Sequence, residues 1–163
     1  MKVSSTLWQN IESNKIFSSY QKVLLSFWEK KYKDVILSAS KLIASFDEKK
    51  QSIPIGVFYR VWIESLAETK DYASLRILKD HLLGSFFEKN PDDKTALVAL
   101  IHLELDEVEA CQLYTTALKS SNSRSCYFLE LEDRLRMRFL QEEKQMPVLS
   151  QSKKPLFDFF HWK

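Results

Sequence analysis

Apolar residues recur at intervals of three and four along most of the chain, the spacing that places them on one face of an α-helix. The first clear stripe starts near Lys15. Its members are Ile16, Tyr20, Val23, Leu24, Phe27 and Trp28. Short polar or proline-containing breaks separate further stripes of the same kind, so the pattern predicts one helix after another as far as about Gln145.

The breaks divide this pattern into three helix pairs and a terminal helix. Their apolar stripes run over residues 16–28 and 32–46, 55–66 and 72–86, and 96–103 and 108–118, and the terminal helix runs from about 125 to 145. The stretch 90–93, Asn-Pro-Asp-Asp, breaks the fourth helix and caps the fifth. Pro54 stands in the first turn of the third helix, where a proline is best tolerated. Asp71 is a candidate N-cap for the fourth helix, and Pro147 ends the last one.

The second helices of the pairs begin at similar intervals. Tyr32 and Tyr72 open the first two of them, 40 positions apart, and Val108 opens the third 36 positions further on. A period of this size is typical of helical arrays, in which each hairpin buries its apolar face only by stacking on its neighbours. The pattern therefore predicts an all-α array of about three helical hairpins, followed by a C-terminal helix and an aromatic tail.

The hairpins resemble repeats of the tetratricopeptide (TPR) family, which share a loose pattern of large, small and aromatic positions. In the second hairpin, Leu66 and Ala67 stand like the family's large–small pair near the end of the first helix. Tyr72 stands like the aromatic residue that opens the second helix. Trp28 and Tyr32 give a partial match in the first hairpin.

This resemblance covers about residues 15–120 and is irregular in spacing. In the third hairpin Val108 replaces the aromatic residue, while Ala117 falls at a small position. Glu29 and His81 stand where the family has small residues. The resemblance implies a short right-handed α-solenoid with a concave surface that holds a peptide or helix of another protein, and no catalysis.

Composition agrees with a single helical domain. A chain of 163 residues fits one domain, and 45% hydrophobic residues supply a core, which excludes a mainly disordered chain. Two glycines and four prolines are too few for the tight turns and phosphate loops of barrels or Rossmann-like folds. We expect an N-terminal segment at residues 1–14, a TPR-like domain at 15–145 and the aromatic tail at 146–163.

Charge and hydropathy narrow the partners and the location. The net charge of +2 comes from 24 basic and 22 acidic residues mixed along the chain, so binding to duplex nucleic acid is not indicated. Residues 1–10 lack the apolar core of a secretory signal, and no run approaches the ~18 apolar residues of a membrane span. We expect a cytoplasmic protein in which Cys111 and Cys126 are reduced core residues.

No pattern of reactive residues indicates an active site. His81, His102 and His161 do not belong to any catalytic or zinc-binding motif. Glu104 and Glu107 could share a helical face and bind a cation, but a corner of solvated charges is the simpler explanation. We expect no catalytic residue, no cofactor and no metal. The alternative from a different class is an enzyme whose site assembles from scattered Glu and His residues.

The last predicted helix carries three arginines that alternate with apolar residues. Because Arg134 and Arg138 share a helical face and Arg136 does not, the three do not form a basic stripe. Glu130 lies four residues before Arg134, which is the spacing of a helical ion pair. The pattern predicts a salt-bridged, half-exposed helix.

Five polar residues in the first helices of two hairpins are candidates for a partner-binding groove. They are Lys22, Ser26 and Lys30 in the first hairpin and Arg60 and Glu64 in the second. A spacing of four residues places each set along one helical face. Ordinary solvated helix positions would show the same spacing.

The tail concentrates apolar side chains. Within residues 153–163, five of them fall in seven positions: Leu156, Phe157, Phe159, Phe160 and Trp162. Exposed to water they would promote aggregation, so we expect them to be covered by the solenoid groove, by a partner protein or by a membrane interface. The four aromatic residues are therefore further candidates for partner binding.

The predicted function is that of a non-enzymatic adaptor that binds a protein or peptide through a solenoid face, the aromatic tail or both. A second interpretation is a small secretion chaperone, similar to the TPR-like chaperones of specialised bacterial secretion systems. A third is a membrane-surface protein anchored by the tail.

Overall fold

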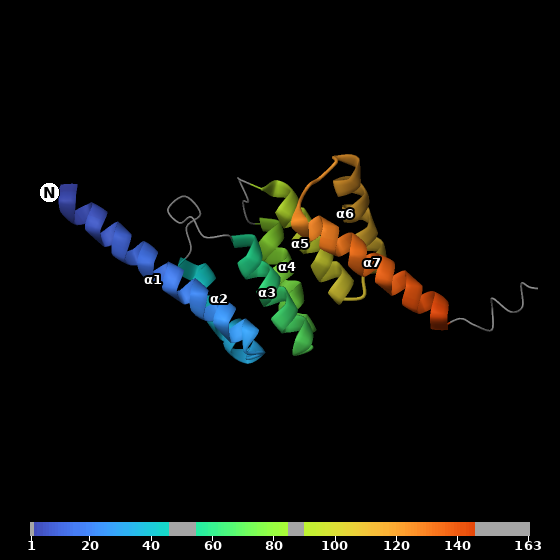
Figure 1. The fold of residues 1–163 in the computed structure, drawn as a ribbon, viewed down its shortest axis with the longest axis horizontal. Helices are drawn as coiled ribbons and strands as arrows, with labels where there is room; N and C mark the ends of the chain where they lie inside the picture. Colours follow the sequence, from blue (N-terminus) through green and yellow to red (C-terminus); the bar gives the residue numbers. More distant parts are fainter. Residues whose placement is uncertain (1, 46–54, 85–89, 146–163) are drawn as a thin grey trace, which may run out of the picture.

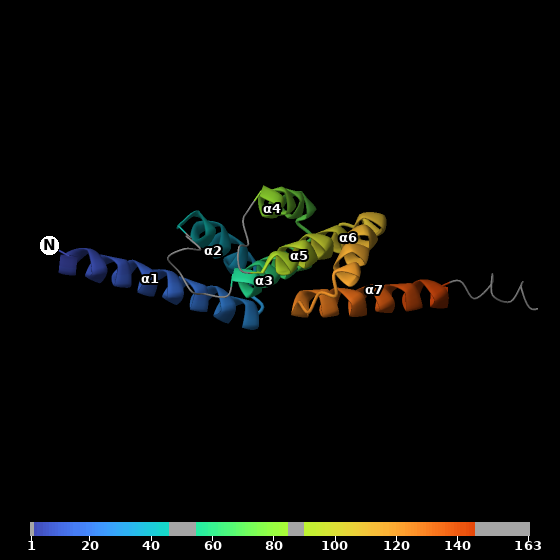
Figure 2. The ribbon, with the colours of Figure 1, turned by 90° about the horizontal axis from the view of Figure 1, so that it is seen from above.

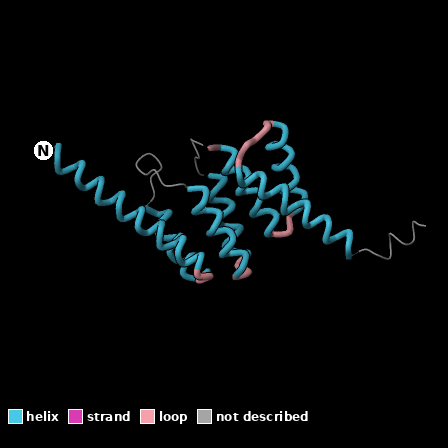
Figure 3. Tube along the Cα trace, viewed as in Figure 1, coloured by secondary structure: helices cyan, strands magenta, loops and turns pink. Residues whose placement is uncertain are grey.

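The computed structural model describes residues 2–45, 55–84 and 90–145, with side chains from Lys15 onward. These residues form seven α-helices and no β-strand (Figures 1 and 3). The helices are α1 (Lys2–Trp28), α2 (Tyr32–Ser45), α3 (Ile55–Glu68), α4 (Tyr72–Gly84), α5 (Pro91–Glu104), α6 (Val108–Ser120) and α7 (Cys126–Gln145). The all-α prediction is confirmed for this part of the chain. Of the described helices, none has the length and apolar character needed to cross a bilayer.

Most helix boundaries match the predicted breaks, including the starts of α2, α4 and α6. α5 begins at Pro91, within the stretch 90–93 that the sequence predicts to cap it, and proline is well suited to the first helical position. α1 begins at Lys2, so its predicted start near Lys15 is wrong. The prediction relied on an apolar stripe, which marks the buried face of a helix and does not show where the helix begins. Residues 2–14 contain no glycine or proline that would interrupt a helix.

Four helices end in the same hydrogen-bonded corner, and none of these corners uses glycine. The left-handed residue has φ of 59° at Lys30, 56° at Lys70, 65° at Asp106 and 52° at Asn122. The next amide donates to the carbonyl five residues earlier, at 2.8–3.1 Å: Lys31 to Ser26, Asp71 to Leu66, Glu107 to His102 and Ser123 to Leu118. This is the Schellman motif, which usually contains glycine. Lysine, aspartate and asparagine make the turns in this glycine-poor chain.

The helices pack in two rows. α1, α3, α5 and α7 pack successively against one another. α2 packs on α1 and α3, α4 on α3 and α5, and α6 on α5 and α7. α2 and α4 lie on the side of α3 and α5 away from α7 (Figure 2). Each hairpin thus rests on the first helix of the next, and one cluster of buried residues includes members from all seven helices.

α5 is the most enclosed helix of the described chain. It packs against α3, α4, α6 and α7, and eight successive residues from Ala96 to Leu103 are buried. A helix that is covered on every side needs apolar residues all round, so α5 lacks the one-sided stripe of its neighbours.

α7 also reaches α3. At Gly56, in the first turn of α3, an added Cβ would lie 2.8 Å from the hydroxyl oxygen of Tyr127 and 2.9 Å from its ring. The close approach of this ring therefore depends on the absence of a side chain at Gly56. Burial raises the pKa of the Tyr127 hydroxyl well above its usual value.

The two cysteines lie in different surroundings. Cys111 is buried, as predicted. Cys126, the first residue of α7, is exposed, so its predicted place in the core is wrong, and both cysteines are free thiols. Burial raises the pKa of the Cys111 thiol to about 11, which suppresses the reactive thiolate at neutral pH. Cys126 is therefore the accessible thiol of the pair.

Candidate functional site

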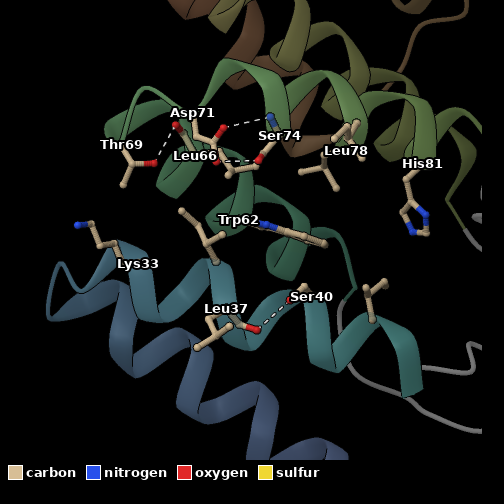
Figure 4. Close-up of a pocket in the computed structure, with 13 residues that line it drawn as sticks. Lys33, Leu37, Ser40, Trp62, Leu66, Thr69, Asp71, Ser74, Leu78 and His81 are labelled. Atoms are coloured by element: carbon tan, nitrogen blue, oxygen red, sulfur yellow. Dashed lines mark hydrogen bonds between the residues drawn. The ribbon is translucent and has the colours of Figure 1, made fainter.

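A groove of about 860 Å³ opens between α2 and α4, with α3 as its floor (Figure 4). We name it the α2–α4 groove. Its lining consists of Lys33, Ile36, Leu37, Ser40 and Ile43 from α2, Trp62, Leu66, Thr69 and Asp71 from α3 and the corner after it, and Ser74, Ile77, Leu78 and His81 from α4. α2 and α4 both pack on α3 but not closely on each other, which leaves the space above α3 open.

The walls of the groove carry large apolar side chains that remain in water. Leu37 on α2 is 59% exposed and Ile77 on α4 is 70% exposed. The ring of Trp62 and the side chain of Leu66 rise from α3 between the two walls (Figure 4). Covering such side chains is favourable, at about 25 cal/mol per Å² of apolar surface. The shape and the side chains of the groove are therefore suited to contact with the apolar surface of another molecule or segment.

α2 and α4 each carry two apolar faces, and only one faces the core. In α2 the buried residues are Val35, Ala39 and Leu42, and in α4 they are Leu75, Leu78 and Leu82. Leu37 and Ile77 belong to neither set and lie instead on the groove side. The groove thus arises from a second apolar face on two helices that share α3 as a neighbour.

The exposed aliphatic position recurs in all three hairpins. Leu37 and Ile77 lie 40 positions apart, the interval that separates Tyr32 from Tyr72. A further 36 positions along, Leu113 on α6 is 73% exposed. It does not line the α2–α4 groove. The second helices of the hairpins therefore share an exposed aliphatic residue at the corresponding position.

The hydroxyl groups in the groove already donate hydrogen bonds within the chain. Ser40 Oγ donates to the Leu37 carbonyl at 2.9 Å, Thr69 Oγ1 to the Ser65 carbonyl at 2.9 Å, and Ser74 Oγ to Asp71 Oδ2 at 2.7 Å. Asp71 also accepts the Ser74 amide at 3.2 Å, which confirms it as the N-cap of α4. These hydrogen bonds from Ser74 lower the pKa of the Asp71 carboxyl group.

His81 is the only histidine among the lining residues, and it does not face a nucleophile there. Its Nε2 lies 3.2 Å from the hydroxyl oxygen of Tyr59. Nucleophilic catalysis needs a base within hydrogen-bond reach of a hydroxyl or thiol that attacks the substrate. In the described lining, the Ser and Thr hydroxyls instead donate to carbonyl or carboxylate oxygens of the chain.

The predicted groove residues Arg60 and Glu64 lie elsewhere, in an ion-pair cluster that joins α3, α5 and α7. Arg60 Nε donates to both Glu130 carboxylate oxygens at 3.0 Å, and its Nη1 lies 2.6 Å from Glu64 Oε2. Arg134 on α7 contacts Glu104 at 2.5 Å, Glu130 at 3.3 Å and Glu64 at 3.6 Å. The predicted Arg134–Glu130 pair is confirmed as one part of this cluster.

Within the cluster, Arg60 and Glu130 each favour the ionised form of the other. Burial alone would lower the pKa of Arg60, but the hydrogen bond and charge of Glu130, together with Glu64, outweigh it and raise that pKa. Burial alone would raise the pKa of Glu130, but Arg60 and then Arg134 outweigh it and lower that pKa. Through their contacts with Glu130 and Arg134, Arg60 and Glu64 connect α3 to α7.

The other predicted partner-binding residues do not line the α2–α4 groove either. On α1, Lys22 is exposed and Ser26 is half-buried, and Lys30 is exposed in the corner that follows. A role in partner binding stays a prediction for these residues, as it does for Arg60 and Glu64. The tail candidates Phe157, Phe159, Phe160 and Trp162 lie outside the described residues.

The acidic side chains at the corner after α5 are paired with histidine and arginine side chains of the same chain. Glu107 Oε2 lies 2.6 Å from Nδ1 of His102, whose ring stacks on Tyr114. Glu104 contacts Arg134, and Asp106 contacts Arg138. The hydrogen bond from His102 lowers the pKa of Glu107. Among the described residues, no group of three or more His, Cys, Asp or Glu side chains is placed to hold a metal ion.

Comparisons with known proteins give no match for this chain, whether to a family model, a curated protein or a solved structure.

Proposed function

We propose that the protein is a non-enzymatic interaction module, a short TPR-like α-solenoid whose α2–α4 groove binds an amphipathic helix of a partner protein. The observation that carries this proposal is the pair of exposed aliphatic side chains, Leu37 and Ile77, on opposite walls of an apolar groove. The stacked hairpins and the intervals of 40 and 36 residues support the solenoid.

The hydrogen bonding of the groove favours a helix over an extended peptide. An extended segment exposes backbone N–H and C=O groups that need partners once they are buried. Ser40, Thr69 and Ser74 already donate their hydroxyl hydrogens within the chain. The backbone groups of a helix form hydrogen bonds within the helix, which presents only side chains to its surroundings. A helix can therefore enter an apolar groove without hydrogen-bond partners from the groove.

The length of the groove sets the size of the partner segment. From Lys33 to Ile43 the α2 wall spans about 15 Å, at ~1.5 Å per residue. This matches about three turns of a helix, whose apolar residues would follow the i, i+3, i+4, i+7 pattern. Burying the exposed parts of Leu37 and Ile77 contributes about 1–2 kcal/mol for each side chain.

Photo-crosslinking from the two walls tests the proposal. A photoreactive amino acid replaces Leu37 in one variant, Ile77 in a second and Leu113 in a third, and the variants are irradiated in the cells that make the protein. Mass spectrometry then identifies the crosslinked peptides. We expect residues 37 and 77 to capture the same amphipathic segment of one protein, which residue 113 does not capture.

Affinity measurements with that segment as a synthetic peptide complete the test. Leu37→Asp and Ile77→Asp should each weaken binding about tenfold or more, because a charge replaces a buried aliphatic group. Leu113→Asp is the matched control, since it alters an equally exposed side chain outside the groove. Equal affinities for all three variants, or different captured segments from the two walls, would refute the proposal.

A further inference from the structure

The last turns of α7 form an open apolar surface at one end of the described chain. α7 has 20 residues, whereas α3 and α5 have 14 each. Its C-terminal part extends past the neighbouring helices (Figure 1). Phe139 and Leu140 in this part are 43% and 46% exposed. α1, α3 and α5 are each followed by a second helix that packs on them, and within the described residues α7 has no such helix.

A depression of about 390 Å³ lies beside these residues, where α6 meets α7. We name it the α6–α7 depression. Leu135, Phe139 and Leu140 supply its apolar surface. Glu132 and Glu143 supply acidic groups, and Arg136, which also lines the depression, is paired with Asp133. Glu132 and Glu143 form no ion pair with another described residue, unlike Glu142, whose carboxylate faces Arg138. An apolar centre beside two carboxylates that form no ion pair, with the arginine of the lining already paired, fits an apolar segment flanked by lysines.

We propose that residues 155–162 of this same chain dock on the α6–α7 depression, with their aromatic rings over Phe139 and Leu140. These eight residues include five large apolar side chains, and lysines precede and follow them. With its three lysines and one aspartate, the stretch 153–163 has a net charge of +2 with histidine neutral, opposite in sign to the two glutamates. Residues 155–162 therefore supply the apolar side chains, and the flanking Lys153, Lys154 and Lys163 supply the positive charge.

The connection is long enough for docking within one molecule. Residues 146–154 can span up to about 30 Å at ~3.3 Å per residue. Phe139 lies only about 9 Å before the end of α7, at ~1.5 Å per residue. The α2–α4 groove is a less accessible destination, because α2 and α4 lie on the side of α3 and α5 away from α7 (Figure 2). Docking on the depression would leave that groove open to a partner.

The test uses the full chain with p-benzoylphenylalanine in place of Phe160. An equal mixture of ¹⁵N-labelled and unlabelled protein is irradiated, so that crosslinks within one molecule are distinguished from crosslinks between two. We expect crosslinks within one molecule, to residues 132–143 of α7 or to Thr115 of α6. Leu140→Glu should reduce their yield about tenfold, and Leu113→Glu, on an exposed part of α6 outside the depression, should leave it unchanged.

The remaining outcomes would overturn the proposal. Crosslinks to Leu37 or Ile77 would place the segment in the α2–α4 groove, and mixed-isotope crosslinks would place it on a second copy. A parallel irradiation with anionic phospholipid vesicles tests a membrane destination, which crosslinks to lipid in place of protein would reveal. Absence of any crosslink, or an equal yield from the Leu140→Glu chain, would equally contradict docking on the depression. Circular dichroism of both glutamate variants verifies that the helices remain folded.

Discussion

Neutralising Glu130 should loosen the attachment of α7 to α3. Arg60 and Glu130 are 70 positions apart in the chain, yet Arg60 Nε lies 3.0 Å from both carboxylate oxygens and Nη2 lies 2.5 Å from one of them. The two side chains are 15% and 34% exposed. Glu130→Gln keeps the size and shape of the side chain but removes its charge, so it tests the ion pair rather than the packing.

The magnitude follows from two limits. A hydrogen bond to a charged group contributes about 1.5–3 kcal/mol to stability, whereas a fully exposed ion pair contributes about 0–1 kcal/mol. The Arg60–Glu130 pair is half-shielded, and Glu64 remains 2.6 Å from Arg60 as an alternative partner. We therefore expect a coupling energy of about 1–2 kcal/mol between Arg60 and Glu130. For a chain of this size, that corresponds to a loss of roughly 2–8 °C in Tm.

A double-mutant cycle measures this coupling directly. Urea unfolding, followed by circular dichroism, is compared for the wild type, Arg60→Met, Glu130→Gln and the double variant. The control is the exposed Arg136–Asp133 pair, for which the same cycle should give less than about 0.5 kcal/mol. A coupling below about 0.5 kcal/mol for Arg60 and Glu130 would refute the inference that this cluster joins α7 to α3.

The pH dependence of stability supplies a second readout of the same cluster. Because Arg60 and Arg134 lower the pKa of Glu130 in the folded state, its contribution is present above the unfolded pKa of about 4.5 and is lost as the pH falls through the folded value. Between pH 6 and pH 3 the wild type should therefore lose more stability than Glu130→Gln. Parallel curves of urea midpoint against pH would contradict this assignment.

Three further predictions concern backbone, packing and thiol chemistry. Lys70→Gly should stabilise the fold by about 0.5–1 kcal/mol, seen as a higher urea midpoint, because Lys70 has a φ of 56°. Gly56→Ala should destabilise the fold by about 1–3 kcal/mol, because it forces a methyl group against the tyrosine ring of α7. The control, Gly84→Ala, should be neutral or stabilising in the same assay, because no atom lies within 4 Å of the added carbon. Cys126 should react with a thiol reagent at neutral pH and Cys111 should react only on unfolding, as quantified by mass spectrometry; equal rates in the folded protein would be inconsistent with the burial of Cys111.

Features that depend on near neighbours in the chain could be predicted from the sequence. The cap at Asp71 and the pair formed by Glu130 and Arg134 each join residues within about one helical turn. The starts of α2 and α4, at Tyr32 and Tyr72, each follow a short run of polar residues that interrupts the apolar stripes. Local spacing and turn chemistry are sufficient for such features.

The site could not be predicted in the same way, because it depends on which surfaces distant helices leave uncovered. Leu37 and Ile77 fall outside the buried stripes of their helices, and local sequence does not distinguish a second apolar face that packs from one that stays open. The spacing of Arg60 and Glu64 predicts a shared face, but not that Glu130 of α7 reaches it. The signal that would have found the groove is the 40-residue interval between Leu37 and Ile77.

The enclosure of α5 has a consequence for how this protein tolerates mutation. In an amphipathic helix, the exposed positions that tolerate substitution recur every three or four residues. The substitutions tolerated in a set of random variants therefore follow the helical period. From Ala96 to Leu103 no such position exists, since all eight side chains meet packed neighbours. A library of variants selected for folding should therefore show an unbroken intolerant block in the middle of the chain, flanked by helices with periodic tolerance.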